Sequence, residues 1–320
     1  MKPRAITEGA LITAIAVILA LGCYYIPFLY LFYVLVPTPI AVLAKRQGVW
    51  VASVSALAAG AITFLFIDPL TASTYMFYYV FVGVALGWCY SSEKSGFVRM
   101  VVGYLGALLA IVLSIAVISA VSGTDVISQI GEAIDLSGKQ ALEIYRSALT
   151  ADQAGNLTET ANTLVEQMKL MIPAVFLILP FFIAWFNVLL TDFILIRTRH
   201  HIEPLKSISR WEPPVSLQVF MALMLVLTII LQLLPANTVP QVYSTTISVL
   251  SDLVFTLQGF SFVFWFLFRK KEKESLLIKV IVVFIALTIP FASLILRFIG
   301  IFDMFSGIRK IIAHRDGDNQ

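Results

Sequence analysis

Long apolar runs, separated by short polar segments, follow one another along most of the chain. Each run holds about 18 to 25 residues, the length that a helix needs to cross a hydrocarbon core roughly 30 Å thick. The runs are continuous rather than alternating, so they predict transmembrane helices and not the strands of a membrane barrel. The candidate spans lie at about 6–25, 28–44, 48–67, 72–90, 98–122, 169–196, 215–234, 244–268 and 276–299.

The segment 124–168 is the longest polar stretch between these runs. Its charges are mostly acidic, and apolar residues recur in it at helical spacing, which predicts one or two amphipathic helices across the outer mouth of the bundle. Gly138 and Gly155 mark the expected breaks. Two interpretations stay open: a lid over a binding cavity, or a surface helix that fills a packing gap.

Lysine and arginine gather in every second connection between the spans, whereas the alternate connections around 68–69 and 235–241 contain neither. By the positive-inside rule, the N-terminus lies in the cytoplasm, and we expect a multi-pass protein of the bacterial inner membrane. A single crossing by 276–299 would leave the basic tail outside, against that rule. Pro290 could instead split this stretch into two half-spans and return the tail to the cytoplasm. We expect nine spans, with the split as the alternative.

Composition excludes a water-soluble globule, because 59% of the residues are hydrophobic and only 13% are charged. The basic residues lie in short loops rather than in a patch, so nucleic acid is not an expected partner, whereas the lipid bilayer is. The predicted fold is all-α: a polytopic bundle of eight or nine transmembrane helices. We expect a six-helix membrane domain at 1–200, which includes the outer segment 124–168, then a cytoplasmic linker at 201–214. Further spans and a tail follow at 215–320.

Known catalytic signatures are missing from the sequence, including HExxH, GxSxG and the phosphate-binding GxxxxGK[ST] loop. The adjacent pair His200 and His201 cannot present both rings on one helix face, so a metal site is not expected either. The sequence therefore predicts neither an enzyme nor a bound cofactor.

Asp252 lies about eight residues into the span 244–268, and Arg297 lies near the end of the span 276–299, both towards the outer side of the membrane. A charge at this depth costs several kcal/mol unless it is paired or hydrated. We expect the two to form a structural ion pair, with substrate or proton coupling as the alternative. Asp192 lies nearer the cytoplasmic interface, where hydration makes a charge less informative.

Tyr75, Tyr78 and Tyr79 follow the Asp68–Pro69 turn and a proline-rich second span. Tyrosines at this level usually anchor a helix at the membrane interface. As a cluster beside a bent helix, they could instead line a small-molecule pocket together with Asp68.

Ala10 and Ala14 lie one turn apart on a small-residue face of the first span. Such a face lets another helix approach closely, either within the bundle or from a partner protein.

Residues 6–16 resemble the first helix of the substrate-binding S components of energy-coupling-factor (ECF) transporters, and residues 36–48 resemble their second helix and the basic glycine turn after it. In that group an Ala-x-x-x-Ala face contacts the energising membrane subunit, and Ala10 and Ala14 match it. The resemblance implies an S-component-like arrangement of the first six helices, with both ends inside.

The whole chain is more similar to the YybS-like family of uncharacterised bacterial membrane proteins, which is distantly similar to those S components. The features that carry this resemblance are Pro173 and Pro180, the WEPP motif at 211–214, and the motifs at 300–303 and 307–310. The spans after residue 200 and the long outer segment depart from a standard S component.

The leading functional hypothesis is a non-enzymatic binding or transport subunit that captures a small molecule from outside, beneath the 124–168 segment. A partner such as an energising subunit, or an ion gradient, would supply the energy. The alternative is a structural or regulatory protein that assembles with other envelope proteins. A weaker alternative is an enzyme for lipid-linked substrates that uses Asp252, Arg297 or Asp303.

Overall fold

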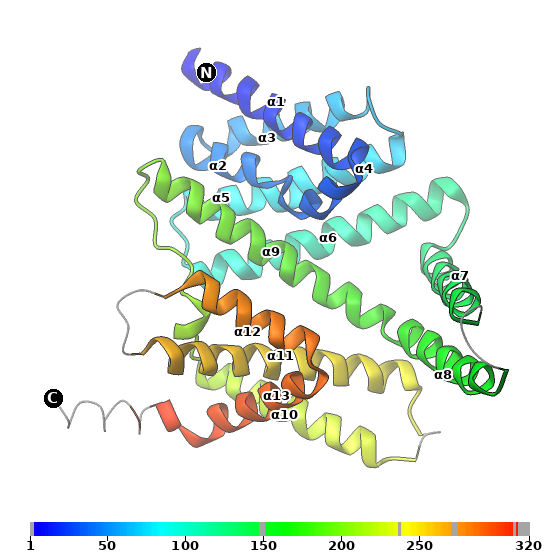
Figure 1. Cartoon of the computed structure of the whole chain (residues 1–320). Coiled ribbons are helices and arrows are strands. Elements are labelled where there is room, and N and C mark those ends of the chain that lie inside the picture. The colour runs from blue at the N-terminus through cyan, green and yellow to red at the C-terminus, as the bar shows by residue number, and fades with distance from the viewer. Residues whose placement is uncertain (1–2, 147–150, 236–237, 270–273, 310–311, 313–320) are drawn as a thin grey trace. The chain divides into compact units, whose positions relative to one another are not determined.

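The computed structural model describes residues 3–146, 151–235, 238–269, 274–309 and 312, and every regular element among them is a helix (Figure 1). The all-helical fold is therefore confirmed. The chain divides into two compact units, Met1–Leu205 and Lys206–Gln320, called unit 1 and unit 2 below. The division falls inside the segment 201–214, which the sequence marked as a linker.

Unit 1 contains nearly two thirds of the chain. Its helices are α1 (Pro3–Tyr25), α2 (Thr38–Gln47), α3 (Val49–Thr63), α4 (Pro69–Phe77), α5 (Ala85–Ser91), α6 (Gly96–Ser122), α7 (Val126–Arg146), α8 (Ala151–Leu170) and α9 (Ile172–Arg197). A 3-10 helix, η1 (Pro27–Leu35), precedes α2, and a π-helical segment, η2 (Tyr78–Val84), joins α4 to α5.

Two of the expected spans of unit 1 are irregular, and a third is short. Pro27–Gln47 is one candidate span that combines η1 and α2, and Pro69–Ser91 is another that combines α4, η2 and α5. The expected span 48–67 is shorter than predicted, because α3 ends at Thr63 after 15 residues. A helix of that length is about 22 Å long, less than the roughly 30 Å of a hydrocarbon core.

Small residues let the helices of unit 1 approach one another closely. A Cβ added at Gly106 of α6 would lie 2.0 Å from the carbonyl oxygen of Phe81 in η2. A Cβ at Gly87 of α5 would lie 2.3 Å from that of Ala44 in α2. Lipid is as apolar as a protein interior, so close van der Waals packing of this kind holds membrane helices together.

One end of unit 1 is rich in basic residues. There, Lys45 at the end of α2 pairs with Glu93, which follows α5, at 3.2 Å. Arg46 forms an ion pair with Glu8 near the start of α1. The start of α6, with Arg99, and the end of α9, with Arg197, lie at the same end. We call this the basic end of unit 1.

The opposite end of unit 1 carries the paired helices α7 and α8, between the end of α6 and the start of α9 (Figure 1). Lys169 of α8 pairs with Asp135 of α7 at 2.7 Å. Gly138 and Gly155 do not break the helices as expected, and the connection falls at 147–150, outside the described residues. Gly138 instead makes room for Val165, whose side chain lies 2.4 Å from where a Cβ would stand.

Unit 2 consists of α10 (Val215–Leu233), α11 (Gln241–Phe268), α12 (Leu276–Thr288) and α13 (Pro290–Ser306), with a short 3-10 turn, η3 (Ile208–Arg210), before α10. The chain bends by 113° between α12 and α13, so the single straight ninth span that we favoured does not form. The bend falls at Pro290, which lacks a backbone N–H and clashes with the preceding turn of a continuous helix. The described helices thus give seven candidate spans, or eight if the bent pair counts as one.

α13 runs alongside α11 in the same direction. The contacts Asp252–Arg297 and Gln258–Asp303 advance together along both helices. Two glycines make this approach possible, because a Cβ at Gly259 would lie 2.0 Å from the carbonyl oxygen of Leu296, and one at Gly300 equally close to that of Phe255. α12 and α13 therefore form a hairpin, in which the start of α12 and the end of α13 lie at the same end of unit 2.

Candidate functional site

The tyrosine cluster, for which interface anchors and a small-molecule pocket were the two alternatives, is part of the packed core of unit 1. Tyr75 is 1% exposed and Tyr79 is fully buried. The ring of Tyr33 lies 5.0 Å from that of Tyr75 and 4.9 Å from that of Tyr78, edge to face in both cases. The Tyr79 hydroxyl donates to the carbonyl of Ala16 at 2.8 Å. The structure brings these rings together, but they fill the space between their helices.

Asp68 is exposed and begins α4 as its N-cap. Its carboxylate accepts hydrogen bonds from the Thr71 amide at 3.0 Å and from the Tyr24 hydroxyl at 3.2 Å. The contact with the Thr71 amide is a typical N-cap hydrogen bond, and the contact with Tyr24 joins this cap to the end of α1. Asp68 therefore has a local structural role, apart from the buried tyrosine rings.

Asp252 and Arg297 form the ion pair that the sequence suggested. The distance from Arg297 Nη1 to Asp252 Oδ2 is 2.7 Å, and it connects α11 to α13. Both side chains are more than a third exposed within unit 2. Arg297 Nε is buried without a hydrogen-bond partner. The pair fixes α13, the second helix of the bent pair, at one point along α11.

Ala10 and Ala14 are exposed on α1, whereas their neighbours Gly9 and Thr13 are buried. Gly9 faces α3, where a Cβ would lie 3.2 Å from the Ser55 hydroxyl. α1 therefore has two small-residue faces: one packs inside unit 1, and the other is open.

The most deeply buried charges of unit 1 form a cluster that sequence reasoning missed. Arg99 of α6 is 1% exposed and Asp192 of α9 is 4% exposed. Arg99 Nη1 lies 2.6 Å from Asp192 Oδ1, and the Tyr90 hydroxyl donates to the same oxygen at 2.6 Å. The guanidinium also lies 4.6 Å from the centre of the Tyr90 ring. This cluster ties α5, α6 and α9 together near the basic end.

The same cluster holds the backbone that follows α9. The amide of Leu205 donates to Asp192 Oδ2 at 2.7 Å, and Arg99 Nη2 donates to the carbonyl of Glu203. The side chains of Ile202 and Leu205 pack against the core. The first part of the expected linker 201–214 is thus fastened across the basic end of unit 1.

Two cavities lie at the basic end. The first has a volume of about 450 Å³, and the second about 500 Å³. Both are within the usual size range of small-molecule sites, about 300–1,000 Å³. Segment 198–203 borders both, because its residues His201 and Glu203 line the first cavity, whereas Thr198 and His200 line the second. The adjacent histidines thus serve different cavities, and segment 198–203 is their shared wall.

The two cavities have different linings. The first combines Lys45, Lys94, Arg99 and His201 with Glu93, Glu203, Tyr90 and Ile202. Among the described residues, those that line the second are all polar or charged: Arg4, Glu8, Arg46, Gln47, Thr198 and His200. In the second, Glu8 accepts from Gln47 at 2.5 Å and pairs with Arg46, so the single carboxylate orients two of the donors.

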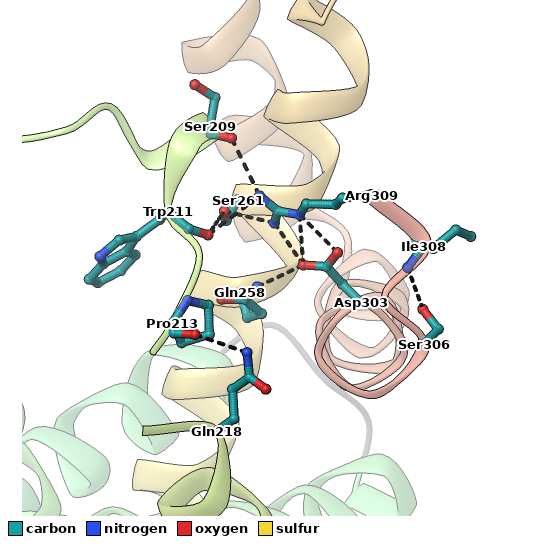
Figure 2. Close-up of polar contacts among 10 residues, drawn as sticks. All are labelled: Ser209, Trp211, Pro213, Gln218, Gln258, Ser261, Asp303, Ser306, Ile308 and Arg309. Carbon is teal, nitrogen blue, oxygen red and sulfur yellow. Dashed lines mark hydrogen bonds and ion pairs between the residues drawn. The ribbon is translucent and has the colours of Figure 1, made fainter. Parts of the chain in front are cut away.

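Unit 2 has its own buried polar network, shown in Figure 2, which joins three of the sequence motifs. Arg309 Nη2 lies 2.7 Å from Asp303 Oδ2, and Gln258 donates to the same oxygen at 2.6 Å. Arg309 also donates to Ser261 Oγ at 3.0 Å and to the carbonyl of Trp211 at 3.4 Å. Trp211, Asp303 and Arg309, one residue from each of these motifs, therefore meet beside Gln258 and Ser261 in the C-terminal half of α11.

A left-handed turn makes the Asp303–Arg309 contact possible. Gly307 follows α13 with φ +59°, a conformation that costs glycine little, and it turns the chain back on the helix end. Asp303 and Arg309 are each 7% exposed. Because both charges are buried and paired, the network supports a structural role: it fastens the end of α13 to α11 and to the segment before α10.

A second ion pair extends this network to the start of α12. The hydroxyl of Ser207 donates to the carboxylate of Glu274 at 2.6 Å, and the ammonium group of Lys279 donates to the same carboxylate. Partial burial alone would raise the pKa of Glu274, but the hydrogen bonds from Lys279, Ser207 and Ser209 outweigh it and lower that pKa to about 2. Glu274 therefore stays ionised and fixes the polar connection 207–209 to the start of the hairpin.

The missed pairs had only a weak signal in the sequence. Arg99 and Asp192 each lie close to the end of a span at the same side of the membrane, and 93 residues separate them. Asp303 and Arg309 lie on either side of a glycine turn, a pattern that suggests a local contact. Among the described residues, no three His, Cys, Asp or Glu side chains gather as a metal site would require.

In the described part of the chain every regular element is a helix, and seven or eight candidate spans are long and apolar enough to cross a membrane. These features define an integral membrane protein in contact with the lipid bilayer. The chain belongs to the family described as "Predicted membrane protein (DUF2232)", whose family model matches residues 14–304. No curated protein and no solved structure matches the chain.

Proposed function

We propose that this protein is a non-enzymatic subunit of the bacterial cytoplasmic membrane that binds a small molecule at the basic end of unit 1. The observation that carries the proposal is the pair of cavities of about 450 and 500 Å³, lined by charged and polar side chains. The motif resemblance to S components of ECF transporters agrees with a binding role and implies a partner that supplies energy.

The positive-inside rule supports the orientation of this site. Lys45, Arg46, Lys94 and Arg197 all lie at the basic end, and this supports a cytoplasmic location for that end and for the N-terminus. In unit 2, the α12–α13 hairpin returns Arg309 to Trp211, which follows the arginine-rich connection after α9. A cytoplasmic tail then satisfies the same rule.

The proposed site lies at the basic end, and not at the outer tyrosines beneath segment 124–168, where the sequence suggested capture from outside. Tyr75, Tyr78 and Tyr79 are buried against one another and Tyr33, whereas the cavities lie where α1, α2, α5, α6 and α9 converge. Binding at that end suits release to, or sensing of, a cytoplasmic molecule.

Mass spectrometry of small molecules released from the purified protein tests the proposal. His201→Trp fills the first cavity and His200→Trp fills the second, whereas Leu31→Trp changes a residue that is 80% exposed in η1 and serves as the control. We expect a bound molecule in the wild type and in Leu31→Trp, and its loss in one of the histidine variants. Equal recovery from all variants, or none from the wild type, would contradict the proposal.

The second candidate is a structural or regulatory subunit that assembles through α1. The exposed positions Ala10 and Ala14 favour it, because small residues on an open membrane helix permit close contact with another helix. A membrane protein that co-purifies with the wild type but not with Ala10→Trp would support this candidate.

A further inference from the structure

We infer that the second cavity binds a phosphate group, either on a lipid headgroup or on a soluble phosphorylated molecule. This inference rests on the proposed function and names its ligand class. The lining contains the guanidinium groups of Arg4 and Arg46 and the ring of His200, against the single carboxylate of Glu8. Arginine is suited to phosphate, because its planar fork of N–H donors matches two phosphate oxygens at once.

Glu8 orients two hydrogen-bond donors of this cavity and does not cancel its positive charge. Its side chain is 13% exposed, and it holds Arg46 through Nε and Gln47 through the side-chain amide. The Nη donors of Arg46 and the whole guanidinium of Arg4 are not engaged by Glu8 in this arrangement. The cavity therefore has more hydrogen-bond donors and positive charge than Glu8 can satisfy, and none of the described residues that line it is apolar.

The position of the cavity is also suited to a phosphate. Its lining comes from the start of α1, the end of α2 and the residues that follow α9, all of which lie at the end of spans. The phosphates of membrane lipids lie at this level of a bilayer, and soluble phosphorylated molecules reach the same level from the cytoplasm. Lipid headgroups and soluble molecules present the same phosphate group, so the experiment must distinguish these two sources.

The test uses the full-length protein in detergent, with phosphatidylglycerol and inorganic phosphate as probes. Native mass spectrometry counts the lipids that stay bound, and a titration with inorganic phosphate follows the thermal transition. Arg4→Gln removes one donor group without touching the Glu8–Arg46 pair. Arg46→Lys keeps the charge but loses the planar fork. Arg197→Gln is the matched control, because it removes one charge at the same end, from a side chain that stacks 5.5 Å from the Phe193 ring and lines neither cavity.

We expect about tenfold weaker binding in Arg4→Gln and in Arg46→Lys, and unchanged binding in Arg197→Gln, as for the loss of one charge-assisted hydrogen bond. Retained phosphatidylglycerol that inorganic phosphate does not displace identifies a lipid headgroup. Saturable binding of inorganic phosphate, with no retained lipid, identifies a soluble ligand.

An equal loss of binding in Arg4→Gln, Arg46→Lys and Arg197→Gln would overturn the inference, because the charge of the basic end alone would then explain the binding. A neutral molecule that is released from the wild type and is still bound by Arg4→Gln would also overturn it, while the proposed binding function would stand. If neither probe binds and no molecule is released, both the inference and the proposed function fail.

Discussion

Gly300→Ala is expected to destabilise unit 2, because α13 has no room for a side chain at this position. The added Cβ would lie 2.0 Å from the carbonyl oxygen of Phe255 and 2.8 Å from the amide nitrogen of Gly259. Both neighbours are backbone atoms, so no side-chain rotation relieves the clash. The two helices must separate by about 1 Å before a distance of 3.0 Å is reached, and overpacking of this kind costs roughly 1–3 kcal/mol.

The matched control is Gly131→Ala in α7, where a Cβ would meet nothing within 4 Å. This substitution makes the same chemical change in an open helix, and it should stabilise the helix by about 0.5–1 kcal/mol. The two variants should therefore move the thermal transition of the purified protein in opposite directions. The assay is a thermal scan of intrinsic fluorescence in detergent.

A Gly300→Ala protein as stable as the wild type would refute the close packing of α13 on α11. Equal losses in both variants would show that any helical glycine is sensitive, independently of this contact. A second test of the same kind is available in unit 1, where Gly106→Ala would place a Cβ 2.0 Å from the carbonyl oxygen of Phe81.

The remaining predictions concern charges and the open face of α1. Asp192→Ala should lower stability by about 3–5 kcal/mol, because it leaves Arg99 buried without its partner; the double variant Asp192→Leu/Arg99→Met should recover most of this loss in a thermal scan, and no recovery would argue against the pair. Glu274, with its lowered pKa of about 2, stabilises the fold fully above its ordinary pKa of 4.5, and this contribution disappears as the pH falls from 4.5 towards 2. Glu274→Gln should therefore lower stability at neutral pH and flatten the pH dependence in that window, whereas an unchanged pH profile would refute the role of this carboxylate. Ala10→Trp should leave the stability of the isolated protein within about 0.5 kcal/mol of the wild type, because the position is exposed; a large loss would show that this face is packed.

The sequence was a good guide to the helices, because a membrane span needs a long apolar run and little else. It was less informative about where the runs are interrupted. The bend at Pro290 was one of two alternatives, since a proline in an apolar run can kink a helix or end it. The short α3 was not expected, because the apolar residues after Thr63 continue the run although the helix does not.

Contacts between spans were harder to predict than the spans themselves. Asp252 and Arg297 could be paired from the sequence, because opposite charges lie towards the outer side of two neighbouring runs. Arg99 and Asp192 lie near the interface, where a charge is often solvated, so depth gave no reason to pair them. For α1, both Gly9–Thr13 and Ala10–Ala14 are small-residue faces. Lipid and protein interior are equally apolar, so hydrophobicity could not decide which of them packs inside.

Segment 198–203 has a thermodynamic consequence as the shared wall of the two cavities. It is fastened at its far end, where Arg99 and Asp192 hold the backbone of Glu203 and Leu205. If both cavities bind ligands as proposed, a ligand that displaces this wall from one side would change the volume available on the other. The affinities of the two cavities are then linked, and linkage is reciprocal: whatever factor the first ligand imposes on the second, the second imposes on the first.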